Sequence, residues 1–206
     1  MIENIFKLEK IQNSIVAGTD EVGRGPWAGP VVAAAVVFKK QDIKEYYQDI
    51  TDSKKLTEKK RQRIYQNLIN DPDLIFAIAS VASQEIDQIN ILQASLKAMN
   101  LAINKLSTQP EFIFVDGNYK IPGQKISQRA IVKGDSKSIS IAAASIIAKV
   151  YRDDLMQQLS KDFPHYAWDK NKGYGTKLHQ DAIAEFGICS HHRKSFAPIK
   201  AVLEAA

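Results

Sequence analysis

Two neighbouring acids, Asp20 and Glu21, stand between an apolar run and a turn rich in glycine and proline. The runs 15–18 and 31–38 on either side predict two short strands, so we expect the acids at a strand end. Because neighbouring side chains of a strand point to opposite faces, both carboxylates can serve one site only where the strand ends or twists. Carboxylate oxygens beside exposed backbone amides suit a hard cation in contact with a phosphate. The pair therefore indicates a metal site that touches a phosphate backbone.

The turn that follows the acids distinguishes this interpretation from an ordinary acidic strand end. Residues 22–30 contain three glycines, two prolines and Arg24, which is more than a connection between strands needs. Glycine lets a ligand approach the backbone closely, and Arg24 adds a permanent forked cation among the amides. The stretch lacks the glycine spacing and the helix N-terminus of a dinucleotide-binding fingerprint, and it is not a P-loop.

A third acid, Asp116, also follows a predicted strand, the apolar run 112–115. Ligand sites of α/β sheets gather beyond the strand ends, so two strands that deliver carboxylates to one edge would build a cation site. Asp135 stands shortly before a predicted helix, 139–150, which is rich in small residues. For Asp135 alone, an N-cap is favoured over a ligand.

Three further segments suit contact with a nucleic acid, although each has an ordinary alternative. Lys54 lies in a polar turn before a predicted helix, where a phosphate could bind, but such lysines are more often solvated. Tyr174 stands between two glycines with little local packing, so we expect it to be presented to a ligand. The segment 189–196 gathers potential phosphate contacts, and a solvated basic turn explains it equally well.

Length and composition indicate one domain with a single core. The 206 residues are 45% apolar and 25% charged, as in ordinary globular proteins, and the net charge of +5 is weak evidence for a polyanionic partner. Cys189 is the single cysteine, which excludes an intramolecular disulfide framework and fits a reducing cytoplasm. No apolar run is long enough to span a membrane, and the N-terminal sequence lacks the order of a signal peptide. We expect a cytoplasmic protein.

Apolar periodicity predicts the remaining elements. They are strands over 74–82 and 130–132, and helices from 57 onward and over 83–106, 178–186 and 199–206. The charged residues 152–154 are expected to form the exposed continuation of the helix over 139–150.

Seven blocks of residues follow one another along most of the chain: 20–26 with 28–31, 52–56, 115–117, 133–137, 142–150 with 152–153, 172–176, and 192–193 with 195–196. In type and order they resemble the type 2 ribonucleases H, in particular bacterial ribonuclease HII. Trp27 is a mild departure, since a smaller aliphatic residue is more usual there, and it puts nothing catalytic in doubt.

The resemblance implies an α/β, ribonuclease H-like fold with a five-stranded mixed sheet flanked by helices and a small helical C-terminal extension. It implies one catalytic domain over 1–206, with about 178–206 as the extension. It also implies a site of four catalytic, metal-binding carboxylates, and it changes the interpretation of the last of them from cap to ligand: Asp20, Glu21, Asp116 and Asp135. Asp52 and Asp153 are the competing acids. Such oxygen ligands suit two Mg²⁺ or Mn²⁺ ions in the substrate complex.

The activity implied is that of an endoribonuclease that hydrolyses the RNA strand of RNA/DNA hybrids. It would also cut 5′ of single ribonucleotides in duplex DNA, as in ribonucleotide excision repair, and leave 3′-hydroxyl and 5′-phosphate ends. The backbone of Gly23, Arg24 and Gly25 would sense the ribose 2′-hydroxyl, and Tyr174 would stack on the following sugar. Candidate phosphate contacts are Lys54, Lys137, Thr176, His192, Arg193 and Ser195.

A monomer is expected, and no protein partner is indicated. Two alternatives stay open beside this reading. One is a nuclease of the same fold that acts on branched or single-stranded DNA, against which the glycine-arginine-glycine block argues. The other is an inactive module that binds hybrids, against which the intact acids argue.

Overall fold

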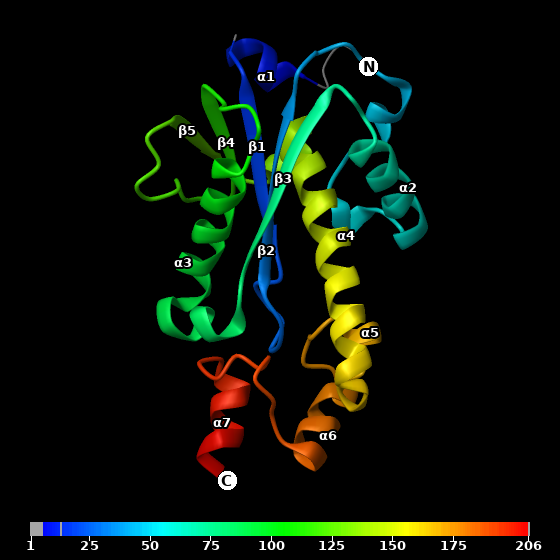
Figure 1. Ribbon diagram of the computed structural model, residues 1–206, viewed down its shortest axis with the longest axis vertical. Helices are drawn as coiled ribbons and strands as arrows, with labels where there is room; N and C mark the ends of the chain where they lie inside the picture. Colours follow the sequence, from blue (N-terminus) through cyan, green and yellow to red (C-terminus); the bar gives the residue numbers. More distant parts are fainter. Residues whose placement is uncertain (1–5, 13, 206) are drawn as a thin grey trace.

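The computed structural model describes residues 6–12 and 14–205, and its centre is a mixed sheet of five strands (Figure 1). The strand order is β3-β2-β1-β4-β5. Strand β2 pairs antiparallel with β1 and β3, whereas β1, β4 and β5 run parallel. The strands are β1 (Val16–Val22), β2 (Val31–Phe38), β3 (Leu74–Val81), β4 (Phe112–Asp116) and β5 (Ser127–Ile131). The expected mixed sheet flanked by helices is confirmed.

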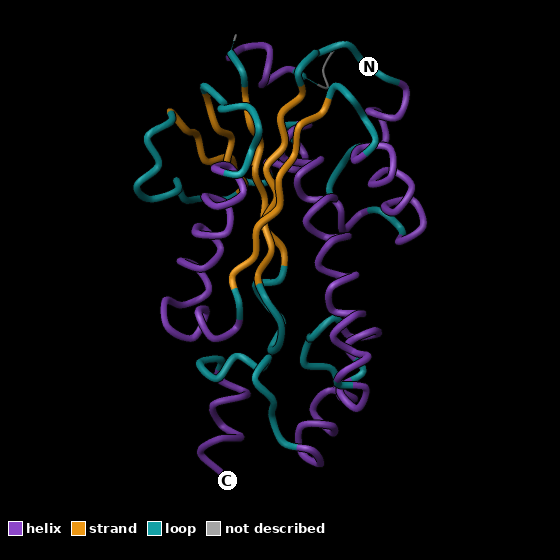
Figure 2. The backbone as a smooth tube through the Cα atoms, viewed as in Figure 1, coloured by secondary structure: helices purple, strands orange, loops and turns teal. Residues whose placement is uncertain are grey.

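Helices cover both faces of this sheet and extend beyond one end of it (Figure 2). The α-helices are α1 (Lys7–Gln12), α2 (Glu58–Ile69), α3 (Ser83–Asn104), α4 (Ile139–Asp162), α5 (Trp168–Asn171), α6 (Lys177–Phe186) and α7 (Ala197–Ala205). Short 3-10 turns are η2 (Glu45–Asp49), η3 (Ser53–Lys55), η4 (Gly134–Ser136) and η5 (Pro164–Tyr166).

Strand β2 is apolar throughout because both of its faces are covered. Its odd-numbered residues, Val31 to Val37, lie in the core cluster beneath α3. Its even-numbered residues, Val32 to Val36, lie in a second cluster with side chains of α2 and α4. An uninterrupted apolar run is what a strand needs when each face meets a helix.

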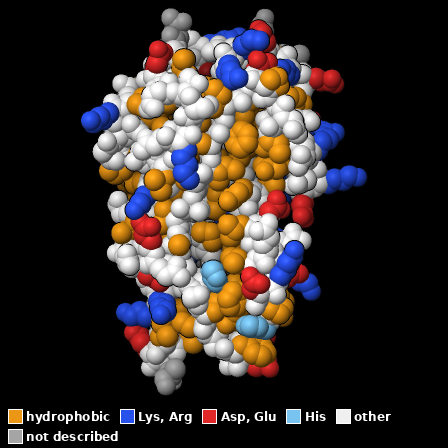
Figure 3. Space-filling model, in the orientation of Figure 1, with side chains coloured by type: hydrophobic (Ala, Val, Ile, Leu, Met, Phe, Trp, Pro, Cys, Tyr) orange, Lys and Arg blue, Asp and Glu red, His pale blue; other side chains and the backbone are white. Residues whose placement is uncertain are grey.

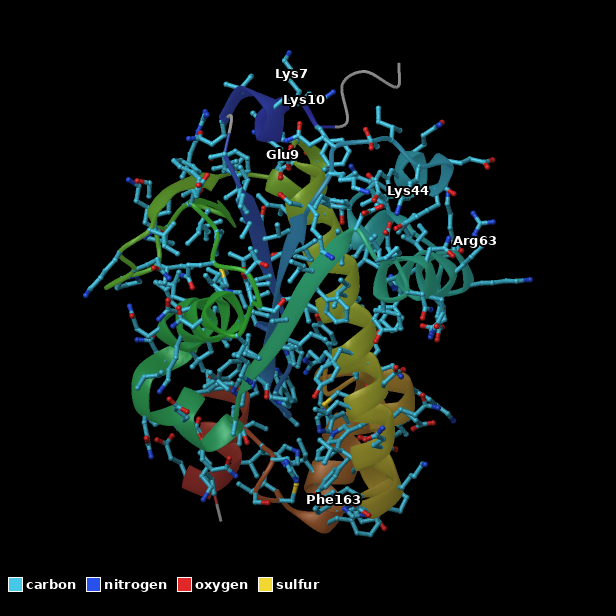
Figure 4. All side chains as sticks on the ribbon, turned by 45° about the horizontal axis from the view of Figure 1, so that its top comes forward. Lys7, Glu9, Lys10, Lys44, Arg63 and Phe163 are labelled. Atoms are coloured by element: carbon cyan, nitrogen blue, oxygen red, sulfur yellow. The ribbon has the colours of Figure 1, made fainter. Side chains whose placement is uncertain are left out.

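Helix α4 approaches the sheet closely where β1 carries Gly18. A Cβ atom added to Gly18 would lie 2.3 Å from the backbone nitrogen of Ile141, so no larger residue fits there. Ser138 caps α4, since its hydroxyl accepts from the N–H of Ile141 at 3.3 Å. Glu9 of α1 sits at the same helix N-terminus, where its Oε1 accepts from the hydroxyls of Ser138 and Ser140 (Figure 4). The small residues predicted for this helix therefore serve close packing against β1.

The far half of α4 continues past the sheet and organises the C-terminal part of the chain (Figure 1). Met156, Trp168, Ile183 and Ile199 form one buried cluster there, which joins α4 to α5, α6 and α7. Helices α6 and α7 form the small helical C-terminal extension that the resemblance implies.

Strand β3 forms one edge of the sheet, and four of its side chains, Ile75 to Ile78, are only half-buried. Apolar side chains gather in the middle of the face drawn in Figure 3, in the region where Figure 1 places β3. In the described part of the chain, no helix is both long enough and apolar enough to cross a membrane.

Three predictions differ from the structure. Strand β1 continues through both acids to Val22, because β2 pairs with it along that length. Helix α3 is kinked at Asn90, whose backbone has a positive φ of 66°. The apolar periodicity over 83–106 predicted one continuous helix and gave no sign of this kink. Arg152, expected in the exposed continuation of α4, is fully buried.

A cluster around Asp71 fastens the segment between β2 and α2 to the end of α2. The carboxylate accepts hydrogen bonds from Lys44, from the hydroxyls of Tyr46 and Tyr47, and from the N–H of Asp73. Figure 4 shows Lys44 beside α2. Burial alone would raise the pKa of Asp71, but these hydrogen bonds, that of Lys44 first, lower it to about 2.

We predict that Asp71→Asn lowers the free energy of unfolding at pH 7 by about 2 kcal/mol, since the folded pKa lies below that of the unfolded chain. A depressed carboxyl pKa stabilises the fold above the unfolded value of about 4, and this contribution disappears as the pH falls from about 4 to about 2. Urea titrations over this pH range should show the gap between wild type and variant closing. The exposed Asp42 supplies the control, Asp42→Asn, and a pH-independent gap would contradict the prediction.

Candidate active site

The register of the sheet brings the first and third acids together. Strands β1 and β4 run parallel with Thr19 opposite Val115, so the next residue of each strand is an acid, Asp20 and Asp116. Glu21 follows in β1, opposite Ala33 of β2. Three carboxylates from two neighbouring strands thus lie at one place in the sheet.

Asp135 is brought to the same place by the turn η4. The N–H of Gly134 donates to Oδ1 of Asp116 at 2.7 Å. The approach is close, because a Cβ added to Gly134 would lie 3.0 Å from that oxygen and 2.6 Å from Cδ1 of Ile141, and these side chains would have to shift. Since Ser138 is the cap of α4, Asp135 is not used as one.

Asp52 also lies close to Asp135, and the two carboxyl groups influence each other. Burial raises the pKa of Asp135, and the charges of Asp52 and Asp116 add to this effect. Asp52 is engaged at its own turn, where its carboxylate accepts from the N–H of Lys54 at 2.9 Å. The hydroxyl of Ser53 in the same turn bonds that of Ser145 in α4 at 2.9 Å, which fixes the turn beside the acids.

The acids carry more negative charge than their surroundings compensate. Burial raises the pKa of Asp20 well above its usual value, and the charges of Glu21 and Asp116 raise it further. Burial likewise raises the pKa of Glu21 to about 7, although the nearby guanidinium of Arg24, 3.5 Å away, opposes the shift. Bringing a cation to these oxygens would relieve this repulsion.

The donor set fits a hard divalent cation, because it consists of carboxylate oxygens gathered at one place. As they stand, no three His, Cys, Asp or Glu side chains within residues 6–12 and 14–205 are spaced to hold a metal ion. A cavity of about 180 Å³ opens beside Asp135 and is lined by Thr51, Lys137 and Ser138, among others. Asp135 itself lines this cavity, so a ligand can reach its carboxylate there.

The glycine-rich turn follows directly after the acids, and its residues Arg24 and Gly25 are exposed. The backbone N–H groups of these two residues donate to no other group of the described chain. A Cβ on Gly25 would lie 3.4 Å from the ring of Tyr174, and the Tyr174 side chain is 45% exposed. The structure therefore brings together the turn and the tyrosine, which lie far apart in the sequence.

A buried chain of hydrogen bonds holds Tyr174. The indole N–H of Trp168 donates to Nε2 of His179 at 3.1 Å, so that nitrogen carries no proton. Nδ1 of His179 then donates to the carbonyl of Tyr174 at 3.0 Å, and Nε2 of His192 lies 3.1 Å from Nε2 of His179, where it shares that single acceptor with the indole. Burial lowers the pKa of both histidines, that of His192 to about 4, which keeps the chain neutral at pH 7.

Two of the residues expected to contact phosphate cannot do so. The side chains of His192 and Arg193 are buried, at 1% and 0% exposure, and both are committed to internal hydrogen bonds. Sequence reasoning took a basic segment for a surface one, because the core that covers it is built from distant elements. Ser195 lies on the surface, but its N–H and its hydroxyl both donate to Asp87.

The other expected contacts stay accessible. Lys54 is exposed and lies close enough to Asp135 for its charge to oppose the rise in the pKa of that carboxyl. Lys137 is exposed, although its ammonium donates to the carbonyl of Val132 at 2.7 Å. Thr176 caps α6 by accepting from the N–H of His179 at 3.4 Å, which leaves its hydroxyl proton free to donate.

Sequence reasoning missed Arg152, His179 and Asp87, which position the loops around the site. The sequence carried a signal for Arg152, because the apolar residues Ala148 and Met156 lie four residues before and after it, on the same face of the helix. Both are buried in the structure. No comparable signal marked Asp87 or His179.

Comparisons with known proteins show the family of the chain. The sequence description of the family Ribonuclease HII matches residues 17–199. The chain is 54% identical over 190 residues to a ribonuclease HII of Chlamydia caviae, covering 92% of this chain and 87% of the relative. It is 52% identical over 194 residues to a ribonuclease HII of a Wolbachia of Brugia malayi, covering 94% of this chain and 93% of the relative. The crystal structure of ribonuclease H2 from Pyrococcus horikoshii superposes with a TM-score of 0.76 at 28% identity, covering 92% and 97% of the two chains.

Fold, matched residues and relatives agree, and we conclude that this chain belongs to the ribonuclease HII family, hydrolases with ribonuclease H activity on RNA/DNA hybrids.

Proposed function

We propose that the chain is a metal-dependent endoribonuclease that hydrolyses the RNA strand of hybrids and also cuts 5′ of single ribonucleotides embedded in duplex DNA. The ends left would be a 3′-hydroxyl and a 5′-phosphate. The observation that supports this most is the meeting of the carboxylates of β1 and β4 with an exposed glycine turn and Tyr174. The carboxylates would carry out the hydrolysis, and the turn with Tyr174 would select the position of the cut.

Asp20, Glu21, Asp116 and Asp135 would hold two Mg²⁺ or Mn²⁺ ions in the substrate complex. When bound, such ions supply an activated water and stabilise the leaving oxygen in phosphodiester hydrolysis. The N–H of Gly134 would orient the Asp116 carboxylate, as it does in the free protein. Because the acids repel one another, the ions should bind weakly until a phosphate completes their coordination.

The exposed N–H groups of Arg24 and Gly25 would contact the ribonucleotide, with Gly23 shaping the turn. Backbone groups can approach a 2′-hydroxyl closely where side chains are absent, and this hydroxyl is what distinguishes RNA from DNA. Tyr174, beside Gly25, would stack on the sugar that follows and favour a deoxyribose. A junction between RNA and DNA would then be the preferred substrate.

Phosphate contacts would come from Lys54, Lys137 and Thr176, which flank the acids and Tyr174 and can position the duplex without reading its bases. Ser195 would contribute only by exchanging its hydrogen bonds to Asp87. This set replaces the larger one expected from the sequence.

We also propose that residues 1–206 form one ribonuclease H-like catalytic domain that acts as a cytoplasmic monomer, with about 178–206 as its C-terminal extension. The buried cluster that joins α4 to α5, α6 and α7 supports a single domain. Removal of misincorporated ribonucleotides is the biological role that such an activity would serve.

We predict that the wild-type protein with Mg²⁺ or Mn²⁺ cuts a labelled DNA duplex just 5′ of its single ribonucleotide. Asp20→Asn and Asp116→Asn should each reduce cleavage at least about 100-fold while the duplex still binds, because each removes charge from the metal site. Gel analysis of the products and a binding titration measure both effects, and Asp181→Asn, on the exposed face of α6, is the control. Binding without any cut by the wild type would leave only a hybrid-binding module, and equal cutting of all-DNA duplexes would exclude 2′-hydroxyl sensing.

In metal-free buffer we expect Asp20→Asn to unfold at a higher temperature than the wild type. The raised pKa of Asp20 means that its charged form costs stability at pH 7, and the amide should recover about 1 kcal/mol of it. Adding Mg²⁺ should raise the melting temperature of the wild type more than that of the variant, because a ligand of the native state stabilises it by mass action. A variant that melts lower than wild type without metal, or that gains as much from Mg²⁺, would contradict the four-carboxylate site.

Tyr174→Ala should lower cleavage at a single ribonucleotide about tenfold, the size expected for one lost stacking contact. Cleavage of a long RNA/DNA hybrid should fall less, since consecutive ribonucleotides offer many registers. The ratio of kcat/KM for the two substrates measures the difference. Tyr119→Ala provides the control because Tyr119 is similarly exposed, at 55%, and lies in another loop. An unchanged ratio would remove Tyr174 from the junction.

A further inference from the structure

Two arginine side chains are fully buried without a carboxylate partner. Arg152 and Arg193 each have 0% exposure, and neither takes part in an ion pair within the described part of the chain. Burial lowers the pKa of Arg152 to about 10, and burial together with the charge of Arg152 lowers that of Arg193 to about 9. Two neighbouring cations inside a protein cost stability unless their hydrogen bonds are satisfied.

All of the hydrogen bonds that satisfy Arg193 go to the backbone of the glycine-rich turn. Its Nη2 donates to the carbonyl of Gly23 at 2.6 Å, and Nη1 donates to that of Arg24 at 3.0 Å. Nε and Nη2 both donate to the carbonyl of Gly29, at 3.0 and 2.9 Å. The forked guanidinium therefore fixes both ends of the turn at once.

Arg152 reaches from α4 to the same turn and to the segment of Tyr174. Its Nε and Nη2 donate to the carbonyls of Pro30 and Ala28, at 3.0 and 3.2 Å, and its Nη1 donates to that of Lys172 at 3.0 Å. The packing is close: a Cβ on Gly23, where φ is +96°, would lie 2.2 Å from Nε of Arg152.

Trp27 ties the two segments together directly. Its N–H donates to the carbonyl of Gly173 and its carbonyl accepts from the N–H of Arg193, both at 2.8 Å. Its indole lies over Gly175, where an added Cβ would come within 2.1 Å of the ring. The turn and the Tyr174 segment are thus held as one rigid unit around two buried cations.

We propose that Arg152 and Arg193 are positioning residues that hold the Gly23-Arg24-Gly25 turn against Tyr174 and thereby set the preference for a junction between a ribonucleotide and a deoxyribonucleotide. The inference rests on the proposed function, since the turn and the tyrosine are the junction reader there. Arg193 thus acts on the substrate through the backbone that it orients. A misplacement of about 1 Å in such a unit can cost about 100-fold in rate.

Arg193→Lys tests this, because lysine keeps the charge but replaces the planar, forked set of donors with a single ammonium. The readout is the ratio of kcat/KM for a duplex with a single ribonucleotide to that for a long RNA/DNA hybrid. We expect this ratio to fall at least about tenfold, whereas a loss of folded protein alone would lower both substrates in proportion. The matched control is Arg63→Lys, whose side chain is 65% exposed on α2, and it should keep the wild-type ratio.

Phe196→Leu provides a second test in case Arg193→Lys does not fold. The guanidinium carbon of Arg193 lies 5.0 Å from the centre of the Phe196 ring, so this milder change loosens the arginine without removing it. The ratio should fall about threefold, because a cation–π contact is worth about 0.5–1 kcal/mol. Phe186→Leu, 55% exposed on α6, is its control.

Cleavage by the wild-type protein distinguishes a failure of the proposed junction activity from a failure of the proposed positioning role. A wild type that cuts the long hybrid but never the single ribonucleotide would refute the proposed junction activity itself. A wild type that prefers the junction, together with variants that fold and keep its ratio, would refute only the positioning role of Arg193.

Discussion

The main-chain pairing of β1 with β4 is the constraint on which the site depends. With Thr19 opposite Val115, each strand delivers its next residue to the same place, and both are acids. A shift of the register by one residue would turn one of these carboxylates to the other face of the sheet. The register is in turn fixed by burial, because β4 places Ile113 and Val115 in the core cluster beneath α3. Hydrophobic packing on one face thus determines where the charges stand.

The gathered carboxylates oppose folding in the free protein. Burial and mutual repulsion raise the pKa of Asp20 and Glu21, so the native state prefers fewer charges than neutral pH supplies. The surroundings do little to neutralise them, with Arg24 as the near cation and 51% of its side chain exposed. Such an arrangement is expected where function, rather than stability, determines the placement of groups. The rest of the fold, including the dense contact of α4 with β1 at Gly18, compensates for it.

Positive charge has two separate uses in this molecule. Lysines such as Lys54 remain at the surface, where their flexible ammonium groups can meet phosphates. The buried arginines instead act as multidentate braces for backbone carbonyls that would otherwise lack partners. The Gly23-Arg24-Gly25 turn belongs to neither a strand nor a helix, so its carbonyls are not satisfied as they would be in those elements. The buried guanidinium groups supply the missing hydrogen-bond donors, and His179 likewise donates to the carbonyl of Tyr174.

Apolar runs, strand ends and glycine turns are local patterns, and they predicted most strands and helices and three of the candidate acids, whereas the resemblance to a known family supplied the type of fold. Resemblance to a known family added Asp135, for which local reasoning favoured a cap. Only the tertiary structure decided that His192, Arg193 and Arg152 lie inside, and that Asp87 engages Ser195. Burial depends on which distant segments cover a residue, and this is not encoded in the charge of the residue or of its neighbours. A basic segment therefore looks the same in sequence whether it lies on the surface or lies inside and donates hydrogen bonds to a neighbouring loop.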